Sequence, residues 1–303
     1  MRLPMAFDPN ADQEGCERYL AGCLGGRVRL VRASLLPRSS RDAPWRLDVE
    51  LDGVPRAYVL RLESRRIEHE YEMLRAVESL PIPTPRAYGW DPEGRALGVP
   101  CFVADLVDGE SLLPHLLAGE PWAEDLYLDT VCALQSIRRE ELGAAAARLE
   151  REESAAAVLE EARSYFATDP QPVAEAAYDR LRNTMPPLPE SRFSNGDLWP
   201  ENLLVRDGRL AGVIDWANAA FGDPIYEFLL LFFLRPEMRG RGLEERYCRR
   251  MGFDPGVLPW YRGLELFDSW HWVRLLGEPY EQHTDETLRA DLARWLEEST
   301  AGK

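Results

Sequence analysis

The sequence is poor in lysine, and this scarcity excludes one kind of phosphate site. The only lysine, Lys303, ends the chain, so nearly all of the positive charge is arginine. A Walker A loop needs a lysine to contact phosphate and is therefore excluded. Any cation that holds a phosphate inside the fold must be an arginine.

Cysteine motifs and long apolar runs are also missing. The cysteines are widely spaced and form no disulfide or metal motif: Cys16, Cys23, Cys101, Cys132 and Cys248. They are typical of reduced residues in a cytosolic protein. The first fifteen residues contain no apolar signal region, and the longest strongly apolar run, at 228–234, is much too short to span a bilayer. We expect a cytoplasmic protein without membrane attachment.

Positive charge is scarce overall. The chain has 36 basic against 52 acidic residues and a formal net charge of −16. Nucleic acids and anionic membranes bind basic patches, so this balance argues against both partners. An acidic surface is compatible with a cationic small substrate, and it equally serves solubility alone. At 303 residues the chain fits two lobes of a globular protein.

Hydrophobic periodicity and turn signals predict mixed secondary structure. A helix is expected from Asp8 and Pro9 to about residue 25. Strands are expected at 27–35, 45–52, 56–63, 86–90 and 99–106. Further helices are expected at 65–80, 111–118, 122–138, 148–167, 172–183, after Asp223, and at 242–251, 257–276 and 284–300.

Residues 193–224 form the stretch that predicts chemistry, FSNGDLWPENLLVRDGRLAGVIDWANAAFGDP. It contains Asn202 and the aspartates Asp197, Asp215 and Asp223 among turn-forming residues and short apolar runs. Taken singly, each of these turns is about as often purely structural as it is functional. Their combination indicates a catalytic loop followed by a hairpin.

The hairpin places two of these residues together. Asp-Gly at 207–208 lies between apolar runs and is the strongest short-range signal for a two-residue turn. This turn would pair Asn202 with Val213, and alternation then puts Asn202 and Asp215 on one side, about 7–8 Å apart. Asp197 can fold back over the open end. Clustered carboxylates need a divalent cation, so the pattern predicts Mg²⁺ held by Asn202 and Asp215, with phosphate as a further ligand.

The order Gly-Asp-x-x-x-x-Asn, Ile-Asp-Trp, Gly-Asp-Pro resembles the signature of the aminoglycoside phosphotransferase and choline kinase-like family, relatives of the protein kinases. The resemblance implies an α+β, bilobal protein-kinase-like fold, with an antiparallel N-terminal sheet lobe containing a helix and a mainly helical C-terminal lobe. The expected lobes are 1–106, which binds nucleotide, and 107–303, with the catalytic loop and acceptor site. It further implies that Asp197 accepts the proton of an acceptor hydroxyl, or orients it, and that Asp223 braces the loop.

One position departs from the family pattern. The residue two before the catalytic aspartate is usually histidine, whereas here it is Asn195, and none of the four histidines falls in the loop. In the relatives this histidine mainly braces the loop, and asparagine can also donate and accept hydrogen bonds. We expect the change to be tolerated; slow or absent turnover is the alternative.

A phosphate-holding cation is expected in the third strand. Arg61 resembles the strand cation that grips the α- and β-phosphates in the family, and its guanidinium matches phosphate geometry. In the helix at 65–80, Glu70 falls on the buried side and needs a partner. Arg61 is the natural candidate, and the pair matches the couple that kinases use to position phosphates. Glu78 is the other candidate acid.

Two further nucleotide contacts follow from the resemblance. Ser39 and Ser40 occupy the tip of the loop that covers the phosphates in related kinases, and their N–H groups and hydroxyls can hold phosphate oxygens. An ordinary exposed loop is the alternative. The stretch PCFVADLVDGESL resembles the hinge, where backbone groups from Asp105 to Val107 would bind adenine. An edge strand ending in a turn satisfies the same residues.

The implied activity is that of an ATP-dependent small-molecule kinase with Mg²⁺ as cofactor and GTP as the alternative nucleotide. We expect a hydroxyl acceptor, cationic and of aminoglycoside or amino-sugar type, because VIDWANAAFGDPIYEFLLLFFLRP most resembles hygromycin-type phosphotransferases. Choline-like amines, other metabolites, or a nucleotide-binding pseudokinase are the alternatives, and resistance and metabolism both stay open as the purpose. A second hypothesis concerns residues 260–272, whose tryptophans and acids form either a cation-holding wall or core.

Overall fold

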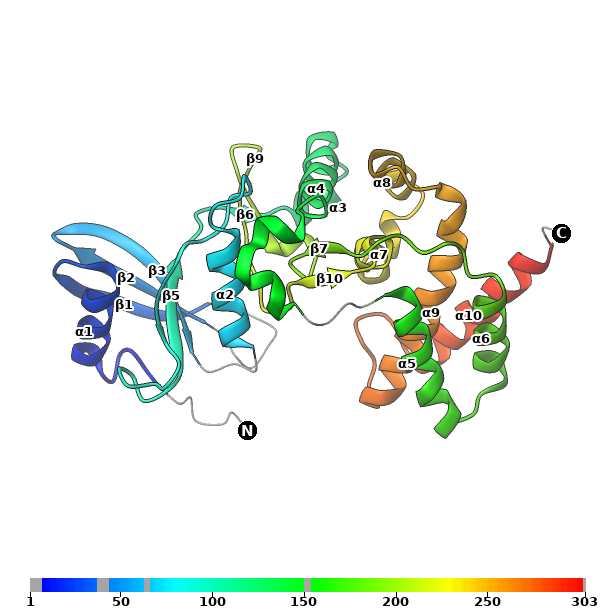
Figure 1. Ribbon diagram of the computed structural model, residues 1–303, viewed down its shortest axis with the longest axis horizontal. Helices are drawn as coiled ribbons and strands as arrows, with labels where there is room; N and C mark the ends of the chain where they lie inside the picture. The colour runs from blue at the N-terminus through cyan, green and yellow to red at the C-terminus, as the bar shows by residue number, and fades with distance from the viewer. Residues whose placement is uncertain (1–6, 37–43, 63–65, 150–153, 302–303) are drawn as a thin grey trace. The chain divides into compact units, whose positions relative to one another are not determined.

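The protein is described by a computed structural model that covers residues 7–36, 44–62, 66–149 and 154–301 (Figure 1). The predicted phosphate-loop residues Ser39 and Ser40 lie outside this part of the chain. Packing divides the chain into two compact units. The first unit comprises Met1–Pro114, Arg139–Arg148 and Glu201–Ala219, and the second comprises His115–Arg138, Leu149–Pro200 and Ala220–Lys303. The predicted functional boundary between residues 106 and 107 stays a prediction, while packing groups the hairpin at 201–219 with the N-terminal residues.

The first unit contains an antiparallel five-stranded sheet in the order β1-β2-β3-β5-β4. Its strands are β1 (Val28–Leu35), β2 (Trp45–Leu51), β3 (Val54–Leu62), β4 (Ala87–Asp91) and β5 (Cys101–Asp105). The predicted strands are therefore confirmed. Alternation along β2 turns Trp45, Leu47 and Val49 inward while Arg46 stays exposed.

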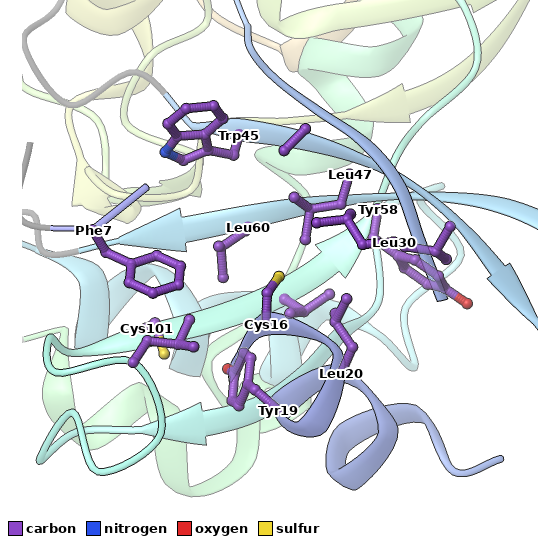
Figure 2. Close-up of a cluster of buried hydrophobic side chains, with 14 of the residues drawn as sticks. Phe7, Cys16, Tyr19, Leu20, Leu30, Trp45, Leu47, Tyr58, Leu60 and Cys101 are labelled. Atoms are coloured by element: carbon purple, nitrogen blue, oxygen red, sulfur yellow. The ribbon is translucent and has the colours of Figure 1, made fainter. Parts of the chain in front are cut away.

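Helices pack on this sheet. On one face, α1 (Gln13–Leu24) contributes Cys16 and Leu20 to the apolar cluster in Figure 2, which also contains Leu60 of β3. On the other face, α2 (Ile67–Val77) brings Tyr71 against Phe102 of β5. Neighbouring residues of a strand point to opposite faces of the sheet. Because Leu60 points to the α1 face, the next residue, Arg61, points to the α2 face.

The predicted start of the first helix at Asp8 is wrong. Helix α1 begins at Gln13, where the side chain of Asp12 accepts a hydrogen bond from the N–H of Gly15 at 2.9 Å. Asp8 instead accepts from the N–H of Asn10 at 2.9 Å and closes a separate turn. Two aspartates therefore compete as caps, and the second begins the helix.

The hairpin and several short elements complete the first unit. Strands β8 (Leu203–Arg206) and β9 (Arg209–Val213) form a three-stranded sheet with β6 (Glu110–Ser111), in the order β6-β8-β9. The 3₁₀ element η1 (Arg139–Arg148) contacts α2, and η2 (Pro200–Asn202) leads into β8. Neither β6 nor η1 was predicted, because such short pieces carry too few residues for a periodic signal.

The second unit is mainly helical. Its helices are α4 (Pro121–Leu134), α5 (Ala155–Thr168), α6 (Pro172–Asn183), α7 (Pro224–Leu234), α8 (Leu243–Met251), α9 (Leu258–Leu276) and α10 (Asp285–Ala301). These confirm the predicted helices, as does α3 (Leu113–Leu117), but the predicted start at residue 148 is wrong because α5 begins at Ala155, after its cap Ser154. Helix α9 packs against α5, α6, α7 and α10 and forms the centre of this unit (Figure 1). The short strands β7 (Arg192–Ser194) and β10 (Ala220–Gly222) pair antiparallel.

Two expectations about environment can be compared with this structure. All five cysteines are free thiols, as expected. Among the described residues, none of the helices combines the length and apolar character needed to cross a bilayer.

Candidate active site

The predicted ion pair between Arg61 and Glu70 is confirmed. Arg61 Nε and Nη2 donate to Glu70 Oε2 at 2.9 and 2.5 Å, and the two residues are only 7% and 5% exposed. Glu78, the other candidate acid, pairs with Arg75 and Arg86 instead. Charges buried this deeply are stable only when paired, so the fold holds the guanidinium of Arg61 in one place.

The hairpin turn forms as predicted, but the strand pairing farther from the turn differs from the predicted register. Asp207 and Gly208 have φ of 52° and 69°, as a type I′ turn requires. Arg206 faces Arg209, and Val205 faces Leu210, in agreement with the predicted register.

Between Leu204 and Val205 the register then shifts by one residue, because Ala211 of β9 forms a bulge. Leu203 therefore faces Val213, and the predicted pairing of Asn202 with Val213 is wrong. Asn202 lies opposite Ile214 instead, whose N–H donates to the Asn202 carbonyl at 2.9 Å.

Asp215 does not continue the strand. Its φ of 60° lies in the left-handed region, so the alternation used to place its side chain beside that of Asn202 does not apply. Asn202 is 7% exposed and Asp215 is half-buried. The prediction that both bind a metal therefore rests on their adjacent backbones and on the family resemblance, and no longer on the original register.

The chemistry of these two side chains suits a hard cation. An amide oxygen and a carboxylate oxygen are donors that Mg²⁺ accepts, with phosphate and water supplying the remaining ligands. Across the part of the chain that the structure describes, no group of three or more His, Cys, Asp or Glu residues is arranged to hold a metal. The donor set fits an ion that arrives together with a phosphate.

The predicted hinge groups are partly used within the sheet. The N–H of Asp105 donates to the carbonyl of Arg86 at 3.0 Å, and the N–H of Leu106 donates to the carbonyl of Ala57 at 3.4 Å. The backbone groups still predicted to bind adenine are therefore the Asp105 carbonyl and the N–H and carbonyl of Val107. Val107 also packs on β9: a Cβ at Gly212 would lie 3.0 Å from both of its methyl groups.

The loop around Asp197 belongs to the second unit and is braced by Asn195. The fully buried Asn195 donates from Nδ2 to the Asp197 carbonyl at 3.0 Å, and its Oδ1 accepts from the Asp197 N–H at 3.4 Å. Tyr127 donates to the Leu198 carbonyl at 3.0 Å. The expectation that asparagine can both donate and accept at this position is confirmed.

Asp223 has the bracing geometry that was predicted for it. Its Oδ1 accepts from the N–H groups of Ile225 and Tyr226 at the start of α7, and Oδ2 accepts from the Tyr261 hydroxyl at 2.7 Å. Burial raises the pKa of Asp223 above its usual value, and these hydrogen bonds oppose the shift. The residue connects β10, α7 and α9.

The tryptophans of α9 do not form a common wall. Trp260 and Trp270 are buried and donate to the Leu181 carbonyl and to Asp285, whereas Trp272 is 46% exposed. The core interpretation therefore applies to Trp260 and Trp270.

Residues that the sequence did not single out lie near the loop of Asp197. Arg235, at the end of α7, places its guanidinium 5.2 Å from the Trp199 ring centre and 3.6 Å from Glu281. Burial raises the pKa of Tyr280, and the negative charges of Glu281 and Asp197 add to the rise. The only local signal was an aromatic residue among acids in the segment GEPYEQH.

Comparison with known proteins identifies relatives of the chain. The family model described as the phosphotransferase enzyme family matches residues 46–264. Hygromycin-B 4-O-kinase from Escherichia coli is 37% identical over 75 residues, 24% of this chain and 22% of that protein. Acyl-CoA dehydrogenase family member 11 from Rattus norvegicus is 25% identical over 300 residues, 84% of this chain and 38% of that protein. The chain thus matches well under half the length of either curated relative.

Solved structures with similar folds cover nearly the whole chain. A candidate aminoglycoside phosphotransferase from Ralstonia eutropha has a TM-score of 0.73 at 17% identity and covers 98% of this chain and 99% of its own. A mutant of aminoglycoside phosphotransferase APH(4)-Ia, in a ternary complex with AMP-PNP and hygromycin B, has a TM-score of 0.65 at 18% identity, covering 95% and 99%. Choline kinase LicA from Streptococcus pneumoniae has a TM-score of 0.58 at 16% identity and covers 95% of this chain and 99% of its own. These likenesses confirm the α+β, bilobal protein-kinase-like fold.

Proposed function

The chain belongs to the phosphotransferase enzyme family, and from this we propose that it transfers the γ-phosphate of ATP to a hydroxyl group of a small molecule. The observation that carries the proposal is the buried ion pair of Arg61 and Glu70 within the same compact unit as Asn202 and Asp215. Phosphoryl transfer requires mainly alignment and charge neutralisation. A buried, fixed guanidinium and a pair of oxygen donors supply both.

The first unit would hold the nucleotide. Arg61, oriented by Glu70, would bind the phosphates that are not transferred, and backbone groups of Asp105 and Val107 would bind adenine. Mg²⁺ held by Asn202 and Asp215 would neutralise phosphate charge when it is bound. A contribution from Ser39 and Ser40 to the phosphates stays part of the proposal, and GTP is the alternative nucleotide.

Asp197 would act on the acceptor. The acceptor oxygen forms a bond to the γ-phosphorus while the bond from that phosphorus to the bridging oxygen of ADP breaks. The hydroxyl proton passes to the Asp197 carboxylate. Asn195, which holds the backbone of Asp197 on both sides, would keep that carboxylate in position.

A cationic acceptor is the substrate class that we propose. Support comes from Tyr280, whose pKa the negative charge of Asp197 helps to raise, from the exposed Glu281 beside it in sequence, and from hygromycin B and choline kinases among the similar proteins. Arg235 covers the Trp199 ring and also pairs with Glu281 at 3.6 Å, so an acceptor cation would compete with this guanidinium at either residue. With an aminoglycoside as acceptor, the biological role of the protein would be antibiotic resistance. With a choline-like amine as acceptor, its role would be metabolic. A pseudokinase is disfavoured because Asp197, Asn202 and Asp215 are all present.

A coupled assay of ADP release tests the proposal. Purified protein with Mg²⁺ and ATP is screened against aminoglycosides, amino sugars and choline, with neutral and acidic alcohols as controls. Asp197→Ala should lower kcat by about 10²–10⁴-fold, the usual contribution of a general base. Asp207→Asn, which removes an exposed carboxylate from a turn that tolerates asparagine, should leave kcat unchanged. Nucleotide binding without turnover in wild type and variant alike would contradict a kinase, and activity on neutral or acidic acceptors alone would contradict the cationic class.

A further inference from the structure

The segment that follows Asp215 forms a tight turn on a buried anchor. The N–H of Ala219 donates to the carbonyl of Trp216 at 3.1 Å and closes the turn. The fully buried Trp216 donates from its indole N–H to the carbonyl of Val213 at 3.0 Å. Residues 216–219, named here the Asp215 turn, are thus attached to the end of β9.

Helix α2 and Arg66, the residue that precedes it, form hydrogen bonds to the same turn. Arg66 Nη1 donates to Asn218 Oδ1 at 2.8 Å, and His69 Nε2 lies 2.7 Å from the carbonyl oxygen of Ala219. Because a carbonyl oxygen only accepts, His69 Nε2 is the donor. These contacts join positions about 150 residues apart in the chain, within one compact unit.

The backbone of Asp215 gains from such support. A left-handed conformation costs aspartate more than glycine, although aspartate adopts it more readily than most residues, so contacts on either side help to maintain it. Upstream, the bond from Ile214 N–H to the Asn202 carbonyl holds one side. Downstream, the Asp215 turn and its two bonds to α2 hold the other.

We propose that His69 and Arg66 are positioning residues through which α2 sets the backbone of Asp215. Glu70 of the same helix orients Arg61, so one helix positions both the phosphate-binding guanidinium and the metal-side carboxylate. This inference rests on the proposed function, because it assigns roles toward Mg²⁺ and nucleotide.

The test compares His69→Ala with His69→Gln and Arg75→Ala. The amide nitrogen of glutamine reaches about as far as Nε2 of histidine and also donates, so His69→Gln should rescue. Arg75 lies at the far end of α2 in an exposed pair with Glu78, so Arg75→Ala serves as a matched control. Calorimetry measures AMP-PNP binding with Mg²⁺ and with EDTA, and hydrogen exchange measures the amides at 216–219 without nucleotide.

For His69→Ala we expect faster exchange at 216–219 and a Mg²⁺-dependent gain in affinity reduced about fivefold, the effect of one lost hydrogen bond. Exchange equal to that of wild type would overturn the inference. Faster exchange with an unchanged Mg²⁺ gain would also overturn it, because the bond would then be structural only. Absence of nucleotide binding in wild type would instead refute the proposed function, and the roles assigned here with it.

Discussion

The guanidinium of Arg61 donates two hydrogen bonds to a single carboxylate oxygen of Glu70, and both residues are more than nine-tenths buried. This ion pair therefore joins strand β3 of the sheet to helix α2 on its face. Removing one partner leaves the other charge buried without compensation.

Glu70→Ala should lower the free energy of unfolding by about 3–5 kcal/mol, the usual cost of an uncompensated buried charge. Urea titration followed by circular dichroism measures it. Glu78→Ala removes a more exposed acid from the end of the same helix and should cost under about 1 kcal/mol. Equal losses in the two variants would show that burial of the Arg61 pair carries no special cost.

Asn195→Ala should lower kcat about tenfold while the KM for ATP stays unchanged, because Asn195 contacts the backbone of Asp197 and the predicted nucleotide residues belong to the other unit. The part-buried backbone groups of Asp197 lose this partner, and the free energy of unfolding should fall by about 1 kcal/mol. Steady-state kinetics and urea titration measure the two effects. Asn183→Ala, at an exposed helix end, is the control, and a raised KM with normal kcat would contradict the assignment.

Stability should fall between pH 5 and 8 because of Glu265. Burial raises the pKa of Glu265 from 4.5 to about 7, although Arg239 beside it lowers the value, and Glu244 and Arg262 also face it. The folded state thus keeps the proton more tightly than the unfolded state. Its contribution is fully present below pH 4.5 and is lost as the pH rises through about 7.

The expected change in the free energy of unfolding is on the order of 3 kcal/mol, at about 1.4 kcal/mol per pH unit. Urea titrations from pH 5 to 8 should show this slope in wild type and lose most of it in Glu265→Gln. Glu237→Gln, which changes an exposed acid of the same unit, should keep it. A stability that rises with pH in wild type but not in Glu265→Gln would mean that the pKa is lowered instead.

Gly212→Ala should weaken ATP binding about tenfold if Val107 contributes to the adenine site. The added Cβ would lie 3.0 Å from both methyl groups of Val107, so the Val107 side chain must shift by a few tenths of an ångström. Val107→Ala removes these methyl groups and should restore much of the affinity in the double variant. Calorimetry with AMP-PNP measures all three, and additive losses in the double variant would argue against a clash as the cause.

The sequence by itself determined most of the elements, the hairpin turn and the burial of Glu70, because those depend on local rules. Period-two and period-3.6 patterns predicted the main strands and helices, and Asp-Gly predicted the turn at 207–208. The position of Glu70 on α2 predicted its burial and its pairing with Arg61. Each of these conclusions needed only neighbours within a few residues.

Only the tertiary structure decided the rest, since its causes lie far away in the chain. The bulge at Ala211 moves Asn202 opposite Ile214, and no local pattern marks it. The left-handed backbone of Asp215 is maintained by packing, including the bond from His69 to a turn about 150 residues later. Bonds between such distant segments form only after the chain has folded, so periodicity and spacing carry no trace of them.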